Sequence, residues 1–364
     1  MKDKTEVSTE KLKAQIIPPL RKWFQENKRE LPWRSDPTPY HVWLSEIMLQ
    51  QTRVEAVKEY YARFLQTLPT VESLAKAPED QLLKLWEGLG YYSRVRNLQK
   101  AARVLEDRQY ILPDEKKLLL ELPGIGSYTA GAIASIAFGK KETAVDGNLL
   151  RVLSRLREDP RCIDEQKTKS AVEAELLEIY PEEGCGDCNQ AFMDLGATVC
   201  VPGGAPLCHI CPLKPYCKAG QKGTWKNYPV RKAKAGRKIE DRTIIILVDE
   251  DKIALHKRPD KGLLAGLYEF INLEGHLTRQ EVLDYLGAFG LKSLRVRKLA
   301  DAKHIFSHIE WHMIGYEVKA DELEPTRERA QKAGLFFAGH SQIREQYPIP
   351  SAYGAYRDYV LEQS

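Results

Sequence analysis

Four cysteines crowd into one short stretch of the chain and could bind a metal centre. They follow the pattern Cys200-x7-Cys208-x2-Cys211-x5-Cys217. In a reducing compartment such a group is more often a ligand set than a pair of disulfides. Four thiolates suit an iron–sulfur cluster, and they also suit tetrahedral zinc. The remaining cysteines are scattered, and we interpret them as structural: Cys162, Cys185 and Cys188.

Two carboxyl groups stand in settings that favour acid–base chemistry. Glu46 is flanked by the apolar residues Leu44, Ile47 and Met48. Burial among apolar neighbours raises the pKa of a carboxyl group, which can then stay protonated as a general acid must. The alternative for Glu46 is an exposed helix face. Asp146 precedes a predicted helix, where an aspartate is most often only a cap.

A glycine-containing turn could bind phosphate. Leu122-Pro123-Gly124-Ile125-Gly126 is followed at once by Ser127 and a predicted helix. The two glycines would let the backbone turn tightly, and the free amides at the helix start would face outward, ready for an anion. The alternative is a plain corner between two helices. Asp146 follows twenty residues after Gly126.

Helices must position these groups, because periodic apolar residues dominate the chain up to about residue 217. We predict helices at His41–Leu68, from Pro78 to Gly88, at Ser93–Leu105, Thr129–Phe138, Leu149–Leu156, Thr168–Ile179 and Asn189–Val199. Beyond residue 240 the sequence pattern changes to runs of β-branched residues, which are typical of strands. There we predict strands at Thr243–Val248, Lys252–His256, Leu294–Leu299 and Trp311–Val318, with a helix at Arg279–Leu286.

Length and charge limit the possible classes of protein. A chain of 364 residues with 43% hydrophobic and 29% charged residues suits two globular domains. It has no apolar run long enough to span a bilayer, and its first residues do not resemble a signal peptide. A net charge of +4 says little, but Lys214 to Lys238 contains nine Lys or Arg and no acid. That stretch is either a solvated linker or a phosphate contact.

Several motifs together resemble those of one enzyme family. They are Leu31-Pro32-Trp33-Arg34, the stretch WLSEIMLQQT at 43–52, GLGYYSR at 88–94, the glycine turn at 122–126 and Val145-Asp146-Gly147-Asn148. On these residues the chain resembles the MutY family of adenine DNA glycosylases, part of the helix–hairpin–helix superfamily that includes endonuclease III. The resemblance covers roughly Leu20 to Tyr359. It implies an enzyme that flips a mispaired adenine from DNA and hydrolyses its bond to the sugar.

The resemblance also assigns roles to residues. Glu46 would protonate adenine at N7, and Asp146, kept ionised with a low pKa by its polar setting, would stabilise the oxocarbenium ion. Tyr128 and Asn148 would hold sugar, aspartate and water in register. Bifunctional relatives carry a lysine where this chain has Tyr128, so the enzyme is expected to be monofunctional. The adenine pocket would comprise Leu31, Trp33, Arg34 and Gln190. The DNA contacts would be Gln51, Tyr91, Gly124, Gly126, Ser127, Phe306, Ser307 and His308.

The same resemblance implies one 4Fe–4S cluster on Cys200, Cys208, Cys211 and Cys217. The superfamily spacing is C-x6-C-x2-C-x5-C, so the first gap here is one residue longer, and a loop with Gly203 and Gly204 could absorb it. In the family the cluster shapes a basic loop and is not the catalyst. That role would make the stretch from Lys214 a phosphate contact.

The C-terminal part resembles the Nudix-like domain of MutY. The resemblance rests on His256-Lys257-Arg258-Pro259, on GLLAGLYEF at 262–270 and on Phe306-Ser307-His308, which stands where the family inspects 8-oxoguanine. The stretch GHLTRQEVLDYLGAFG lacks the paired glutamates of a magnesium-dependent Nudix hydrolase, so we expect no pyrophosphohydrolase activity.

The expected fold is therefore a mostly α helix–hairpin–helix glycosylase core with an iron–sulfur loop, followed by a smaller α+β Nudix-like domain. Its predicted parts are residues 1–217 with the hairpin at about 118–138 and the cluster loop at 200–217, a basic linker at 218–240, and residues 241–364. The expected partner is double-stranded DNA with adenine opposite 8-oxoguanine or guanine. We expect a monomer in the bacterial cytoplasm, associated with the nucleoid through DNA.

Two other functions stay open on the sequence. One is an endonuclease III-like bifunctional glycosylase and lyase, against which Tyr128 and the second domain argue. The other is a non-catalytic DNA-damage binding protein, which would need neither Glu46 nor Asp146.

Overall fold

The computed structural model describes residues 9–233, 236–288, 290, 293–320, 330–331 and 334–363. Contacts divide the chain into two compact units. The helical unit comprises Met1–Lys76 and Arg96–Ala233, and the sheet unit comprises Ala77–Val95 and Lys234–Ser364. This division differs from the predicted linear one because Ala77–Val95 packs with the C-terminal residues.

The helices up to residue 233 have the following bounds, in chain order. They are α1 (Thr9–Asn27), α2 (Pro32–Ser35), α3 (Pro39–Leu49), α4 (Val54–Thr67), α5 (Val71–Lys76), α6 (Glu79–Leu85), α7 (Ser93–Val104), α8 (Lys116–Leu119), α9 (Ser127–Ala132), α10 (Gly147–Arg157), α11 (Gln166–Ile179), α12 (Cys185–Thr198) and α13 (Lys218–Lys222). Short 3-10 turns lie at Glu106–Arg108, Lys214–Tyr216 and Trp225–Asn227, and a π-helical turn at Ile133–Ala137 continues α9.

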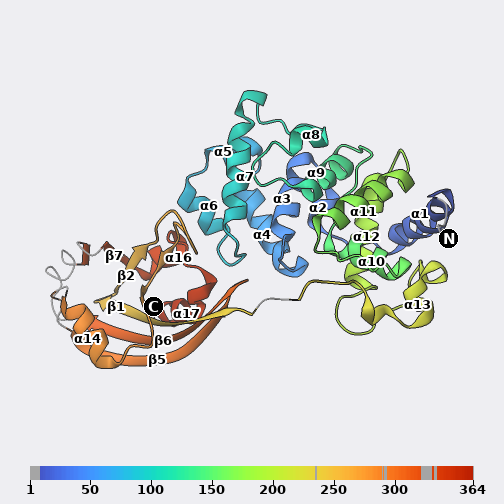
Figure 1. Ribbon diagram of the computed structural model, residues 1–364. Helices are drawn as coiled ribbons and strands as arrows, with labels where there is room; N and C mark the ends of the chain where they lie inside the picture. The colour runs from blue at the N-terminus through green and yellow to red at the C-terminus, as the bar shows by residue number, and fades with distance from the viewer. Residues whose placement is uncertain are drawn as a thin grey trace. The chain divides into compact units, whose positions relative to one another are not determined.

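Two groups of helices make up the helical unit. Figure 1 shows α1, α10, α11 and α12 gathered on one side and α4, α5, α7, α8 and α9 on the other. Leu149 and Leu153 of α10 are buried against Phe192 and Leu195 of α12. Burying a side chain of this size stabilises a fold by about 2 kcal/mol. Helix α3 packs against α4, α9 and the π-helical turn, which buries most of its residues.

The structure confirms most of the predicted helices and corrects one of them. The predicted helix His41–Leu68 is broken into α3 and α4, since Gln51 adopts the left-handed conformation with φ +60°. A residue in that conformation cannot continue a right-handed helix. The sequence did not predict α1, whose interior holds Pro18 and Pro19, residues that normally interrupt a helix.

The first part of the predicted linker is folded onto the helical unit. Helix α13 lies within it, and Val230 forms an isolated parallel bridge with Cys162. The backbone amide of Ile163 donates to the carbonyl of Val230 over 3.0 Å. The stretch up to Ala233 therefore belongs to the helical unit rather than to a free connection.

The sheet unit contains one mixed sheet. Its strands and helices are β1 (Lys238–Asp249), β2 (Lys252–Lys257), β3 (Tyr268–Glu269), β4 (Ile271–Glu274), α14 (Arg279–Ala288), β5 (Ser293–Ile305), β6 (Ile309–Ala320), β7 (Leu335–Gly339), α16 (His340–Glu345) and α17 (Gly354–Glu362). The strand order is β3-β2-β1-β6-β5, with β4 paired to β1 and β7 paired to β2. The predicted strands and the predicted helix in this part are all confirmed.

Strand β1 explains why the sheet is covered on both faces. Ile244 and Ile246 belong to a core that includes Tyr356 of α17, whereas Ile245 and Leu247 belong to a core that includes α14. Alternate side chains of a strand point to opposite faces, so a continuous apolar run requires two covered faces. Strand β1 also pairs parallel with β6 over its length, from Lys238 opposite Ile309 to Val248 opposite Lys319.

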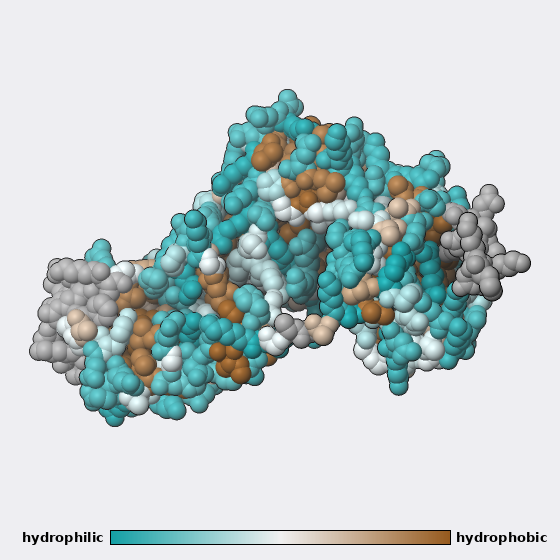
Figure 2. All heavy atoms as spheres, in the orientation of Figure 1, coloured by the Kyte–Doolittle hydropathy of each residue, from teal (hydrophilic) through white to brown (hydrophobic). Residues whose placement is uncertain are grey.

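Hydrophilic side chains cover most of the surface in view (Figure 2), and hydrophobic ones gather in separate patches. Three large apolar side chains of the sheet unit are well exposed: Tyr91 at 46%, Ile239 at 59% and Ile305 at 51%. Ile305 ends β5, immediately before the predicted lesion-inspecting residues. Among the described residues, no helix is both long and apolar enough to cross a membrane.

Candidate active site

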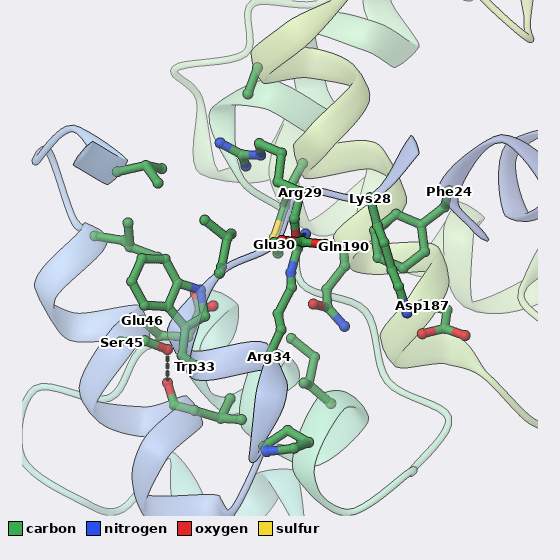
Figure 3. A pocket seen from close by; sticks show the side chains of 18 of the residues that line it. Phe24, Lys28, Arg29, Glu30, Trp33, Arg34, Ser45, Glu46, Asp187 and Gln190 are labelled. Atoms are coloured by element: carbon green, nitrogen blue, oxygen red, sulfur yellow. Dashed lines mark hydrogen bonds between the residues drawn. The ribbon is translucent and has the colours of Figure 1, made fainter. Parts of the chain in front are cut away.

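A cavity of about 850 Å³ opens in the helical unit and brings together most of the predicted site. Its lining includes the predicted pocket residues Leu31, Trp33, Arg34 and Gln190, and the predicted catalytic residues Glu46, Tyr128, Asp146 and Asn148. Figure 3 shows Trp33, Arg34, Glu46 and Gln190 around this space. These residues come from five segments of the chain, so only the tertiary fold assembles them.

Glu46 is held inside α3 with 6% of its surface exposed. The hydroxyl group of Tyr128 donates a hydrogen bond of 2.5 Å to Oε2 of Glu46. Burial raises the pKa of Glu46 to about 7, although the hydrogen bond from Tyr128 acts in the opposite direction. The charge of nearby Asp146 raises the pKa further. Near neutral pH this carboxyl group is therefore partly protonated and can donate a proton.

Asp146 is the N-cap of α10 as well as a residue of the cavity. Its Oδ1 accepts from the amide of Leu149 over 2.7 Å, and its Oδ2 accepts from Nδ2 of Asn148 over 2.7 Å. Capping is thus compatible with the predicted catalytic role, because the side chain both caps the start of α10 and borders the cavity. We expected a polar setting to keep Asp146 ionised with a low pKa. Instead, burial raises its pKa, and these hydrogen bonds only oppose the rise.

Asn148 connects Asp146 to a buried cation. Its Oδ1 accepts a hydrogen bond of 2.8 Å from Nη2 of Arg151. Arg151 is 5% exposed and also donates to the carbonyl groups of Gly196 and Cys200, over 2.7 and 2.8 Å. These bonds fix the amide of Asn148 so that its NH2 group points to Asp146. Sequence reasoning missed Arg151, which looks like an ordinary residue of an amphipathic helix.

A buried aspartate that the sequence analysis missed organises the predicted adenine pocket. Asp194 of α12 is fully buried and accepts hydrogen bonds from Arg34 at 2.8 and 3.0 Å. Nε of Arg29 donates to the same carboxylate over 2.8 Å. Burial alone would raise the pKa of Asp194, but the bonds and charges of Arg34 and Arg29 outweigh it and lower the pKa. The guanidinium group of Arg34 is thereby fixed at the cavity wall, 5.3 Å from the ring centre of Phe24.

The glycine turn has the predicted place at the start of α9, but its two glycines differ. Gly124 has φ +78°, and a Cβ atom there would lie 2.7 Å from Cβ of Asn97. Gly126 has φ −95° and ψ 178°, an extended conformation open to any residue, and no atom lies within 4 Å of the position that a Cβ atom would take. The expectation that both glycines are needed for the turn is therefore wrong for Gly126. The open space in front of Gly126 is available to a ligand.

Ser127 and Gln51 border a second hollow of about 470 Å³ beside the turn. The hydroxyl group of Ser127 donates to both carboxylate oxygens of Glu173, over 2.9 and 3.0 Å. Lys116 forms an ion pair with the same carboxylate. Gln51, in the break between α3 and α4, also lines a hollow with Glu46 and Asp146. The break thus places the exposed side-chain amide of Gln51 in the same hollow as the two predicted catalytic carboxyl groups.

The four predicted cysteine ligands line one enclosed space of about 30 Å³. Nη1 of Arg155 donates to Sγ of Cys200 over 3.3 Å, and the amide of Gly220 donates to Sγ of Cys217 over 3.3 Å. Donors aimed at sulfur atoms suit anionic thiolates. Within the described residues, no three His, Cys, Asp or Glu side chains form a ready ligand group for a single metal ion. The four sulfur-bearing side chains and the donors beside them suit a centre that is held by thiolates.

The remaining predicted DNA contacts lie together in the sheet unit. Phe306, Ser307 and His308 form the tight turn between β5 and β6, closed by a bond from the amide of Phe306 to the carbonyl of Ile309 over 2.8 Å. The ring of Phe306 packs edge-on against Trp311. Tyr91 has φ +47°, and its hydroxyl group lies 3.0 Å from Oγ of Ser307. Two predicted contacts far apart in sequence are therefore direct neighbours.

The sequence is similar to known proteins along most of its length. Residues 44–182 match the HhH-GPD superfamily of base excision DNA repair proteins, and residues 242–357 match the NUDIX domain. The chain is 36% identical to the adenine DNA glycosylase of Mus musculus, over 83% of this chain and 70% of that protein. It is 32% identical to the adenine DNA glycosylase of Buchnera aphidicola subsp. Acyrthosiphon pisum, over 80% of this chain and 83% of that protein.

Solved structures are similar to part of the chain. A thermostable thymine-DNA glycosylase is 30% identical, with a TM-score of 0.53 over 59% of this chain and all of that one. A non-covalent endonuclease III–DNA complex is 25% identical, with a TM-score of 0.51 over 60% of this chain and 99% of that one. Both structures align with more than half of this chain, and the endonuclease III structure is a complex with DNA.

Proposed function

Because the chain belongs to the adenine DNA glycosylase family of base excision repair, we propose that Glu46 and Asp146 are its two catalytic carboxyl groups. The observation that carries the proposal is their convergence. Glu46, bonded to Tyr128, and Asp146, bonded to Asn148, border the same cavity as the predicted adenine pocket.

The proposed reaction begins with a proton on Glu46. This proton passes to N7 of the flipped adenine while the bond between C1′ and N9 breaks, and the bonding electrons leave with the base. Water then forms the new bond to C1′, and its proton passes to a carboxylate of the site. The pKa of about 7 for Glu46 supports this role, since an acid is most useful when its pKa lies near the working pH.

Asp146 supplies negative charge to the oxocarbenium ion. The bonds from Leu149 and Asn148 favour its ionised form and hold the carboxylate in place. The burial that raises the pKa of Asp146 also reduces the screening of its carboxylate, so a positive charge developing on the sugar would be stabilised more strongly than in water. Arg151 maintains this geometry through Asn148.

Tyr128 supports a hydrolytic mechanism without strand cleavage. A lyase of this superfamily needs an amine to attack the sugar, and this position carries a phenol. Burial raises the pKa of Tyr128 well above its usual value, so the hydroxyl group stays neutral and is a poor nucleophile. The hydroxyl group of Tyr128 is instead placed to donate a hydrogen bond to Glu46.

The proposed substrate is double-stranded DNA with adenine opposite 8-oxoguanine or guanine, bound by a monomer at the bacterial nucleoid. Gly124, Gly126 and Ser127 would contact a phosphate, and Gln51 would fill space in the duplex. In the sheet unit, Tyr91 would enter the base stack while Phe306, Ser307 and His308 inspect the opposite base. The exposure of Tyr91 supports this role. In this scheme the helical unit hydrolyses the glycosidic bond, and the sheet unit recognises the base opposite the adenine.

We further propose that Cys200, Cys208, Cys211 and Cys217 hold one 4Fe–4S cluster. When bound, the cluster would fix the loop and present the exposed side chains of Lys214 and Lys218 to DNA. Arg155 would stabilise the thiolate of Cys200. Zinc would be the simpler centre, and metal analysis with the visible absorbance of the purified protein separates the two.

The sheet unit is proposed to recognise the lesion rather than to hydrolyse nucleotides. Helix α14 carries Glu281, whose carboxylate accepts from the amide and the hydroxyl group of Thr278, over 2.7 and 2.8 Å. The carboxylate of Glu281 therefore caps the start of α14.

An alkali test separates the proposed function from its two rivals. The full chain is incubated with a labelled duplex that carries adenine opposite 8-oxoguanine, and one half of the sample is heated with alkali. A break at the adenine only after alkali supports a monofunctional adenine glycosylase. A break without alkali would indicate a lyase, and binding with no break under either condition would indicate a non-catalytic damage binder.

A further inference from the structure

The segment Ala77–Val95 is held to the rest of the sheet unit by polar contacts along α6. Nζ of Lys84 donates to the backbone carbonyl groups of Ile343 and Tyr347, over 3.0 and 3.2 Å. At the start of the helix, the carboxylate of Asp80 lies 3.2 Å from Nζ of Lys257 and accepts a bond of the same length from Tyr268. Both ends of α6 are thus attached to residues more than 170 positions away.

Glu87 joins the end of α6 to the C-terminal residues. Its Oε1 accepts from the amide of Ile349 over 3.0 Å and lies 3.4 Å from Nη1 of Arg357. Its Oε2 lies 2.5 Å from Nζ of Lys84. The side chain is only 12% exposed, so these interactions are less screened by solvent than a surface ion pair.

Hydrogen bonds hold the loop between Glu87 and Tyr91. Nη2 of Arg94 donates to the carbonyl groups of Leu89 and Gly90, both over 3.0 Å. Nε1 of Trp86 donates to the same carbonyl of Gly90 over 3.1 Å. These bonds brace the backbone just before Tyr91, whose hydroxyl group lies 3.0 Å from Ser307.

We infer that Glu87 is a positioning residue for base discrimination: it anchors α6 to the sheet unit and so sets Tyr91 against Ser307. This inference rests on the proposed roles of Tyr91 and Ser307. The turn at Ser307 then recognises the opposite base as Tyr91 enters the base stack, because the two side chains contact each other. Loosening the anchor lowers the preference for 8-oxoguanine over guanine without touching the catalytic cavity.

The test compares Glu87→Ala with a matched variant, Glu72→Ala, in the full chain. Glu72 forms an ion pair of the same length, 2.5 Å, with Lys76 on the exposed surface of α5. Two quantities are measured. The first is the ratio of single-turnover excision rates for adenine opposite 8-oxoguanine and opposite guanine. The second is the fluorescence of 2-aminopurine placed beside the 8-oxoguanine, which rises when the stack is opened.

For Glu87→Ala we expect the rate ratio to fall about fivefold, with a smaller fluorescence rise and little change in the rate opposite guanine. Glu87→Gln keeps an acceptor for Ile349 and restores part of both signals, and Glu72→Ala behaves like the unaltered protein. A Glu87→Ala protein with an unchanged ratio and unchanged fluorescence would overturn the inference. If Glu87→Ala does not fold, Lys84→Met is judged by the same two measurements.

Tyr91→Ala separates this inference from the proposed function. If Tyr91→Ala loses the fluorescence signal and Glu87→Ala does not, the role of Glu87 is refuted while that of Tyr91 stands. If Tyr91→Ala keeps both the ratio and the signal, the proposed role of Tyr91 is wrong, and the inference fails with it.

Discussion

Tyr128 of α9 donates its hydroxyl hydrogen to Oε2 of Glu46 in α3, at 2.5 Å. The bond joins the helix that follows the glycine turn to the helix that carries the proposed acid. A hydrogen bond to a carboxylate favours its ionised form, so the bond lowers the pKa of Glu46 while burial raises it. The balance, a pKa of about 7, lets Glu46 both hold and release a proton near neutral pH.

The pH dependence of excision should respond to this bond. We expect single-turnover excision to decline as the pH rises through about 7, because Glu46 loses its proton. Tyr128→Phe removes a bond that favours the carboxylate, so the declining limb should move to higher pH. Rates measured between about pH 5.5 and about pH 9 check the shift. Tyr216→Phe, an exposed tyrosine on the cysteine loop, is the control. A limb that stays in place or moves to lower pH would contradict the assignment.

Glu46→Gln should stabilise the fold above neutral pH. The folded-state pKa of Glu46 is raised from 4.5 to about 7, so the stability of the unaltered protein falls as the pH rises through this range. Glutamine does not ionise and avoids the loss. The variant's advantage in free energy of unfolding should therefore grow between pH 5 and pH 8, to about 3 kcal/mol at most. Urea unfolding of both proteins at pH 5 and pH 8 measures this difference in free energy of unfolding. A difference that does not change with pH would show that the pKa of Glu46 is not raised in the folded protein.

The two glycines of the turn should respond differently to alanine. Gly124→Ala places a Cβ atom against Asn97 in a left-handed conformation, so we expect about 1–3 kcal/mol of destabilisation. Gly126→Ala meets no neighbouring atom, and its thermal midpoint should stay unchanged. Its affinity for a duplex without a mispair should nevertheless fall, because the methyl group enters the proposed phosphate position. Equal destabilisation by both variants, or full DNA affinity of Gly126→Ala, would argue against this account.

The longer first gap of the cysteine loop should be dispensable. Residues 202–205 are exposed, and Gly203 has open space where a side chain would begin. We expect deletion of Gly203 to leave the iron content and the visible absorbance unchanged. Cys208→Ser removes a proposed ligand and should lose much of both signals. Loss of the cluster on deletion of Gly203 would show that the extra residue is needed.

Local patterns predicted the longer helices from α3 to α14 and the strands β1, β2, β5 and β6, because apolar periodicity and turn residues act over short distances. They did not predict β3, β4, β7 or α17. Glu46 and Asp146 could be assigned from their neighbours and from the family resemblance. Asp194 could not, since its partners Arg29 and Arg34 lie 165 and 160 positions away. Helix α1 was not predicted because its sequence contains two prolines, which tertiary packing tolerates. The attachment of Ala77–Val95 to the sheet unit likewise depends on long-range polar contacts that leave no periodic signal.

The central claim is that Glu46 is the proton donor for base release. It is tested most directly with Glu46→Gln on a duplex that carries adenine opposite 8-oxoguanine, by measuring binding and single-turnover excision in the same preparation. We predict near-normal affinity and an excision rate lower by at least about a hundredfold, because the amide cannot donate the proton that the leaving base requires. Near-normal excision by this variant would contradict the claim and require another source for the proton.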